Sequence, residues 1–153
     1  MISLAQQQYR MIHDIYILLD DGDRRILRSF MLNPSQYTLL TLLDNTQGQR
    51  LTDLSEQLFL NKSTITRLVD QLEQVNLVQR VADPDDRRVQ RVVLTTNGAQ
   101  LRTQAKATHD HSIQQRLNVL SEQEQHQLGA LLSKLRESLR EDLHCFQAPN
   151  DSL

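Results

Sequence analysis

Cationic and hydroxyl side chains gather at two places in the middle of this sequence. The first set is Lys62, Ser63, Thr64, Thr66 and Arg67. The second is the pair Arg87 and Arg88, which follows a run of acidic turn residues. Ammonium, guanidinium and hydroxyl groups form hydrogen bonds with phosphate oxygens and base edges. These residue types at these places therefore predict contacts to double-stranded DNA.

The first set lies at the start of a helix predicted from Lys62 to about Val75. Asn61 precedes this helix and is its expected N-cap, because its side chain can accept a hydrogen bond from an unpaired amide. One face of the helix, about 120° wide, collects the apolar residues Ile65, Leu68, Val69, Leu72 and Val75. A short amphipathic segment at 52–58 and a three-residue turn at 59–61 come before it. The pattern predicts a helix-turn-helix whose second helix exposes the DNA-contacting set.

The arginine pair lies between two strand-like runs, 77–82 and 89–94, in a segment rich in turn formers. This predicts a hairpin, or wing, with Arg87 at a tip that enters the narrow minor groove and Arg88 holding the wing. Asp83 and Asp86 are expected to pair with the arginines and orient them, since carboxylates near phosphate are repelled. The alternative, a metal site built from the acidic residues of this turn, is disfavoured because arginines follow at once.

These motifs together resemble the MarR family of bacterial winged-helix regulators. The resemblance rests on residues 60–73, 77–80, 83–88 and 94–98. The D-x-R-R wing motif and the L-T-x-x-G run that follows it are specific in combination, and the resemblance extends over essentially the whole chain. Asn76 stands where the family usually has glycine, a mild departure because asparagine tolerates the same backbone conformation.

Helices are predicted on both sides of this module. An N-terminal helix runs to about Phe30, and the acidic patch at 20–23, which contains Gly22, leaves open whether this helix is continuous or broken. A second helix starts at a capping box formed by Asn33 and Gln36 and ends at 47–49. A long polar helix begins at Thr95, and a last helix opens at a capping box formed by Ser121 and Glu124. We expect residues 1–32 and 113–147 to form a dimerisation domain, residues 33–112 the DNA-binding domain, and residues 148–153 a disordered tail. The predicted dimer interface consists of Ile12, Ile15, Leu19, Leu132, Leu135, Leu139 and Leu143.

Bulk composition limits the other function classes. The 153 residues carry a net charge of −2, and residues 61–91 hold six basic against five acidic residues, so the DNA hypothesis rests on where the cations lie. The single cysteine, Cys145, excludes an intrachain disulfide and a cysteine-rich zinc site. No long apolar run and no signal-peptide pattern is present, which predicts a cytoplasmic protein that does not enter membranes. No cofactor and no metal is predicted, and the five histidines are expected to be exposed.

The sequence thus predicts a mainly α winged helix-turn-helix with a small antiparallel β-wing. The expected function is a homodimer that binds a pseudo-palindromic operator and regulates transcription. The family resemblance implies repression, and release by a small aromatic or phenolic ligand. Tyr9, Tyr16, Tyr37, Met11 and Met31 are candidates for lining such a pocket, with core packing as the alternative. A winged helix that binds a protein instead of DNA is the rival hypothesis, and an enzyme ranks third because no catalytic constellation is visible.

Overall fold

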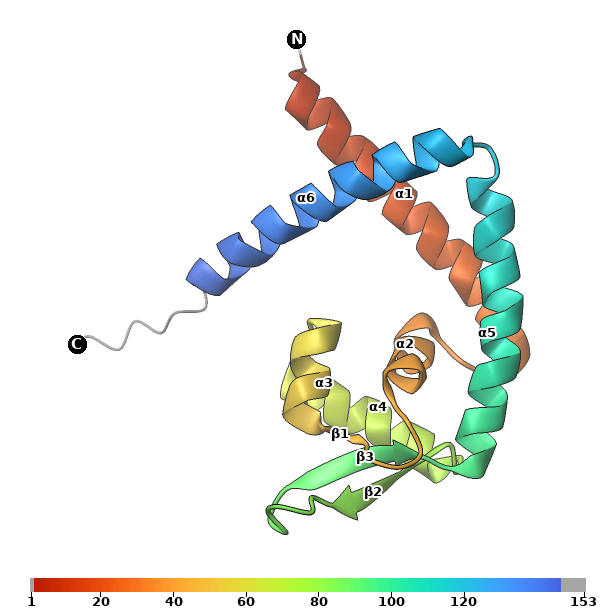
Figure 1. Cartoon of the computed structure of the whole chain (residues 1–153), viewed down its shortest axis with the longest axis vertical. Coiled ribbons are helices and arrows are strands. Elements are labelled where there is room, and N and C mark those ends of the chain that lie inside the picture. Colours follow the sequence, from red (N-terminus) through yellow and green to blue (C-terminus); the bar gives the residue numbers. More distant parts are fainter. Residues whose placement is uncertain (1, 147–153) are drawn as a thin grey trace, which may run out of the picture. The chain divides into compact units, whose positions relative to one another are not determined.

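The computed structural model describes residues 2–146, with side chains as far as residue 142. The predicted tail at 148–153 and the side chains of Leu143 and Cys145 lie outside the described residues. The elements in chain order are α1 (Leu4–Leu27), a 3-10 turn η1 (Arg28–Phe30), α2 (Pro34–Leu42), β1 (Gln49–Arg50), α3 (Leu51–Leu58), α4 (Lys62–Gln74), β2 (Val78–Ala82), β3 (Gln90–Leu94), α5 (Thr96–Leu117) and α6 (Glu122–Phe146) (Figure 1). The fold class is confirmed as a mainly helical winged helix-turn-helix.

Contacts divide the chain into two units, Met1–Asp110 and His111–Leu153, and α5 runs through the boundary between them. The first unit holds α1 together with the whole winged helix-turn-helix. The second holds the end of α5 and all of α6. The predicted assignment of residues 1–32 to a dimerisation domain and of residues 33–112 to a DNA-binding domain requires a second copy of the chain, so it stays a prediction.

The hydrophobic core of the first unit fills the space between the helix-turn-helix, the sheet and the start of α5. Its fully buried members include Leu27, Leu39, Leu40, Leu54, Ile65, Val69, Leu72, Val78 and Val92. Burying one such leucine or valine side chain contributes about 1.5–3 kcal/mol. The predicted core face of α4 is confirmed at Ile65, Leu68, Val69 and Leu72. It is wrong at Val75, which is 62% exposed because the helix ends one residue earlier, at Gln74.

The sheet has three antiparallel strands in the order β1-β3-β2, one more than predicted. β2 and β3 form the expected hairpin, with Val78 opposite Leu94 and Ala82 opposite Gln90 (Figure 1). The helix that was expected to continue to 47–49 ends at Leu42 instead. Asp44 then accepts hydrogen bonds from three successive backbone amides, 46–48, and this turn delivers β1 to the edge of β3.

The predicted caps are confirmed, and so is the left-handed turn at Asn76. Asn33 and Gln36 form a reciprocal capping box at the start of α2, and Ser121 and Glu124 do so before α6. Asn76 has a φ of 57°. The sequence left open whether the first helix is broken near Gly22, and α1 is continuous through this residue to Leu27.

The glycine of the L-T-x-x-G run, Gly98, is needed because its backbone lies very close to the backbone of Leu77. A Cβ added at Gly98 would lie 1.9 Å from the carbonyl oxygen of Leu77. Thr95 fixes this approach, because its backbone amide donates to the same Leu77 oxygen at 3.1 Å and its hydroxyl donates to the carbonyl of Asn76 at 2.7 Å. The Gly98 amide donates to the Thr95 hydroxyl at 3.0 Å. The motif therefore pins the start of α5 to the segment that joins α4 to β2.

Candidate nucleic-acid interface

The N-terminal half of α4 presents most of the predicted DNA-contacting side chains on one exposed surface. Lys62, Ser63, Thr66 and Arg67 are exposed, whereas Thr64 is half-buried. Asn61 caps the helix as expected, and its side-chain oxygen accepts the amide of Thr64 at 2.8 Å. All exposed residues of α4 are polar or charged, and the exposed Val75 follows directly after the helix. This surface lacks the apolar patch that a protein-binding helix would need.

The hydroxyl groups on this surface already donate hydrogen bonds inside the protein. Ser63 Oγ donates to Asn61 Oδ1 at 2.7 Å, and Thr66 Oγ1 donates to the carbonyl of Lys62 at 2.9 Å. A hydroxyl has one donor and two acceptor sites. Because their donors are used inside the protein, these hydroxyls can offer only acceptor sites to DNA, and acceptors suit the amino groups of cytosine and adenine in the major groove better than phosphate.

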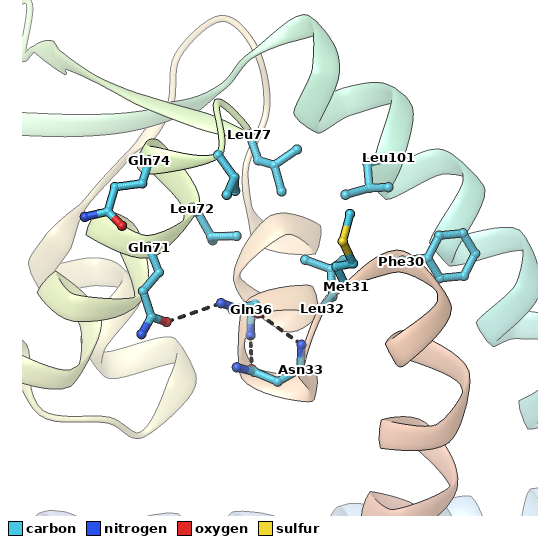
Figure 2. Close-up of a pocket in the computed structure, with 11 residues that line it drawn as sticks. Phe30, Met31, Leu32, Asn33, Gln36, Gln71, Leu72, Gln74, Leu77 and Leu101 are labelled. Atoms are coloured by element: carbon cyan, nitrogen blue, oxygen red, sulfur yellow. Dashed lines mark hydrogen bonds between the residues drawn. The ribbon is translucent and has the colours of Figure 1, made fainter.

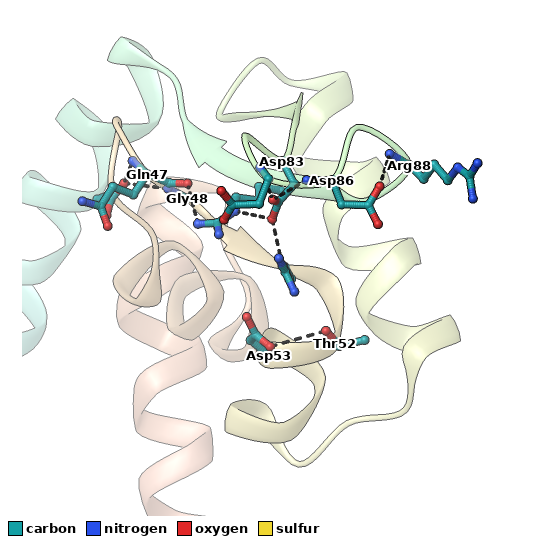
Figure 3. A network of polar contacts seen from close by, with 11 residues as sticks. Gln47, Gly48, Thr52, Asp53, Asp83, Asp86 and Arg88 are labelled. Atoms are coloured by element: carbon teal, nitrogen blue, oxygen red, sulfur yellow. Dashed lines mark hydrogen bonds and ion pairs between the residues drawn. The ribbon is translucent and has the colours of Figure 1, made fainter.

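The base of the wing is organised around Asp83, whose surface is only 1% exposed. One carboxylate oxygen, Oδ2, accepts from Arg50 Nε at 2.8 Å and from Arg91 Nε at 2.7 Å (Figure 3). The other accepts the backbone amides of Asp85 and Asp86 at 2.9 and 3.2 Å. These bonds, those from Arg50 and Arg91 first, hold the pKa of Asp83 well below its usual range. The buried carboxylate is therefore ionised and fully paired.

This pairing differs from the one expected for the wing acids. Asp83 holds arginines at the base of the hairpin and not the tip pair. Arg50 on β1 lies opposite Arg91 on β3 in the sheet register, so both guanidinium groups reach one carboxylate. Arg50 lies 33 residues before Asp83 and belongs to the strand that the sequence pattern did not reveal. No local signal could have identified it.

Asp86 shapes the turn through the backbone and not through an arginine side chain. Its carboxylate accepts the backbone amide of Arg88 at 3.0 Å, and its carbonyl accepts the amide of Val89 at 2.9 Å. Arg87 and Arg88 are exposed, and no described residue forms an ion pair with either side chain. The Arg88 side chain extends away from the polar network in Figure 3. Two cations at the tip are thus available to a ligand outside the protein.

Arg80 ties the wing to α4, a role that the sequence analysis did not assign. Its Nη2 lies 2.6 Å from Asp70 Oδ1, its Nη1 bonds Glu73 Oε2, and its backbone amide donates to Glu73 Oε1 at 3.0 Å. The side chain of Arg80 is 19% exposed. This contact fixes β2 against the helix and neutralises the two acidic groups that α4 carries.

Comparisons with known proteins decide the family of this chain. A family model described as the MarR family matches residues 32–89. The HTH-type transcriptional regulator MhqR of Bacillus subtilis (strain 168) is 31% identical over 120 residues, which cover 78% of this chain and 83% of that protein. The chain belongs to the MarR family. It is accordingly a DNA-binding transcriptional regulator, and the relatives are of a non-enzymatic class.

Solved structures of MarR-type regulators match the fold over most of its length. AbsC, a MarR family transcriptional regulator from Streptomyces coelicolor, has a TM-score of 0.83 and 25% identity, and the match covers 92% of this chain and 98% of that one. A structure of S. aureus MepR in complex with DNA has a TM-score of 0.78 and 26% identity, and the match covers 85% and 96% of the two chains.

Three further predictions concern metal ligands, the histidines and membrane-spanning helices. Among the side chains that the structure describes, no three histidine, cysteine or acidic groups gather as metal ligands. His109, expected to be exposed, is half-buried because its ring packs against Tyr37 at 4.9 Å and its Nε2 lies 3.2 Å from Asp23 Oδ1. No described helix combines the length and apolar character needed to cross a bilayer.

The aromatic and methionine residues suggested for a pocket do not come together. Tyr37 is buried in the core, whereas Tyr9, Met11 and Tyr16 are exposed on α1. Only Met31 of this group lines the cavity at the C-terminal end of α4.

Proposed function

We propose that this regulator is a homodimeric repressor that binds a pseudo-palindromic operator. The observation that carries the proposal is the pairing of two exposed cationic groups in one unit, at the start of α4 and at the wing tip. Three acidic groups near them are paired inside the protein: Asp70 and Glu73 with Arg80, and Asp83 with Arg50 and Arg91. The complex of S. aureus MepR with DNA supports duplex DNA as the partner.

Each predicted contact residue receives a role in this proposal. Ser63, Thr64, Thr66 and Arg67 face the major groove, and Lys62 contacts the DNA backbone. Arg87 enters the minor groove, and Arg88 lies beside it on the wing. Two-fold symmetry would place the two copies of α4 in successive major grooves about 34 Å apart.

Exposed apolar stripes support the homodimer. Ile12, Ile15, Leu19, Leu132, Leu135 and Leu139 are between 41% and 53% exposed in the single chain. Apolar residues repeated along one side of a helix are costly to leave in water, and such patches mark interaction surfaces. We propose that they pack against the same helices of a second copy. We also propose a cytoplasmic location, since the proposed target is chromosomal DNA. The family resemblance supports release of the DNA by a small-molecule ligand.

The wing-tip assignment can be tested by fluorescence anisotropy with operator DNA at fixed salt. Arg87→Ala should weaken binding by about 1–3 kcal/mol, which is about 5–150-fold in Kd. Arg28→Ala, which removes the same charge from an exposed residue outside the proposed interface, is the control and should leave Kd unchanged. Equal affinities for the two variants would refute the role of Arg87.

A further inference from the structure

Three helices of the first unit meet at His109, a residue in the second half of α5. Its ring packs against Tyr37 of α2 with 4.9 Å between the ring centroids, and its Nε2 lies 3.2 Å from Asp23 Oδ1 of α1. The side chain of His109 is only 13% exposed. α5 also lies against the segment that follows α1, because Phe30 and Leu101 line the same cavity (Figure 2). The imidazole therefore lies inside a junction of helices and not on the surface.

The Nε2 atom of His109 is buried without a hydrogen bond. No described residue donates to it or accepts from it, although the Asp23 carboxylate lies within ion-pair distance. A buried polar atom without a hydrogen-bond partner is unfavourable, and most such atoms in proteins are paired. An imidazole that gains a proton carries a positive charge and has an N–H donor at both nitrogens. The junction thus holds a carboxylate at the place where a protonated His109 needs one.

The titratable groups near this ring come from all three helices. Asp23 belongs to α1 and Tyr37 to α2, while Lys106 and Asp110 are neighbours of His109 on α5. Lys106 Nζ lies 2.5 Å from Asp110 Oδ2, so these two charges largely cancel each other. Tyr37 stays uncharged, because burial raises the pKa of its hydroxyl above the usual value. Among the described residues, the charge within ion-pair distance of Nε2 is the carboxylate of Asp23.

We propose that His109 is a proton-dependent clamp between α1 and α5. Histidine is the side chain that ordinarily changes its charge between about pH 5 and pH 8. At the acidic end of this range, a protonated His109 donates from Nε2 to the Asp23 carboxylate. Such a charge-assisted hydrogen bond is roughly twice as strong as a neutral one. At the alkaline end, the neutral ring lacks this bond, and the two helices are held together less firmly.

The clamp would connect two parts of the first unit that have different proposed roles. α1 carries Ile12, Ile15 and Leu19 of the proposed dimer interface. The start of α5 is pinned at Gly98 to the segment that joins α4 to β2. Closing the clamp would fix α1 relative to the DNA-binding surface, so DNA affinity should differ between the two protonation states. This consequence rests on the proposed function, whereas the clamp itself does not.

A double-mutant cycle at two pH values tests the clamp without DNA. Urea titrations of the full-length protein at one fixed concentration give the unfolding equilibrium constants of the wild type, His109→Gln, Asp23→Asn and the double variant. At about pH 5.5 we expect the two substitutions to be coupled by about tenfold, a factor typical of hydrogen bonds to charged groups. At about pH 8 they should be additive within about twofold, as for residues that do not interact. The control is His111→Gln, an exposed histidine further along α5, which should show no coupling to Asp23→Asn at either pH.

Two outcomes would overturn the proposal. One is additivity of the two substitutions at the acidic pH, and the other is the same coupling at both pH values, which would make the contact a purely structural one. If His109→Gln does not fold, Asp23→Asn alone keeps the test, because it should lose more stability at the acidic pH than at the alkaline pH. An equal loss at both pH values would count against the clamp.

The effect on DNA is measured separately, as the ratio of Kd at the acidic pH to Kd at the alkaline pH. This ratio should differ between the wild type and His109→Gln, whereas His111→Gln should keep the wild-type ratio. Equal ratios in all three proteins would refute the effect on DNA binding and leave the clamp in place. Loss of specific DNA binding at every pH, together with a pH-dependent coupling, would refute the proposed function and not the clamp.

Discussion

Replacing Arg80 with alanine tests the link between the wing and α4. The substitution removes two ion pairs whose carboxylates, on Asp70 and Glu73, are 50% and 38% exposed, so water can replace much of what they lose. Pairs of this kind contribute about 0.2–1 kcal/mol each, and the buried stem of the arginine adds packing. We therefore expect the free energy of unfolding to fall by about 1–2 kcal/mol in urea titrations, with Arg28→Ala as the control.

The same substitution has an electrostatic signature in DNA binding. It leaves Asp70 and Glu73 as uncompensated negative charges on the helix that we propose faces DNA. Their repulsion of phosphate is screened over about 10 Å at 0.1 M salt and about 3 Å at 1 M. The loss of affinity relative to Arg28→Ala should therefore be largest at low salt and shrink as salt is raised. Wild-type stability together with a salt-independent effect on Kd would refute the reasoning.

Three further predictions concern the wing base, the start of α5 and the dimer. The pKa of Asp83 is lowered in the fold, so its pairing stabilises the protein fully above the unfolded-state pKa of about 3.9, and this contribution is lost progressively as the pH falls below that value. The variant Asp83→Asn should therefore show a smaller decrease in the free energy of unfolding between neutral and acidic pH. The same decrease as in the wild type would contradict this prediction. Gly98→Ala should cost about 2–3 kcal/mol in thermal or urea unfolding because of the close Leu77 carbonyl, whereas Gly129→Ala, with no atom within 4 Å of the added Cβ, should cost nothing. Leu135→Glu should give monomers in light scattering, and Ser133→Glu on the opposite side of α6 should not; a Leu135→Glu dimer would place the interface elsewhere.

The helix-turn-helix could be predicted because its signals are local. Asn61 as N-cap, the apolar face of α4 and the turn formers of the wing each act within a few residues. The L-T-x-x-G run was visible in the sequence as part of the family resemblance, but the reason for its glycine is the close approach to Leu77, which only the fold shows.

The features that the sequence did not predict depend on partners far apart in the chain. β1 has only two residues, too few for an alternating pattern, and its pairing with β3 makes it a strand. The pairing of Arg50 with Asp83 follows from that strand, so it was missed as well. His109 was expected to be exposed because its neighbours Tyr37 and Asp23 lie on other helices. In each case the deciding interaction spans more than 30 residues.

The most direct test of the central claim is selection of binding sites from a randomised duplex library, followed by titration of the enriched DNA at about 150 mM salt. If two copies of α4 and the wings read DNA, the enriched sequences will contain two-fold related half-sites about 10 base pairs apart. They should bind at least about 10³-fold more tightly than random DNA. No enrichment, or equal affinity for selected and random duplexes, would contradict sequence-specific recognition by this surface.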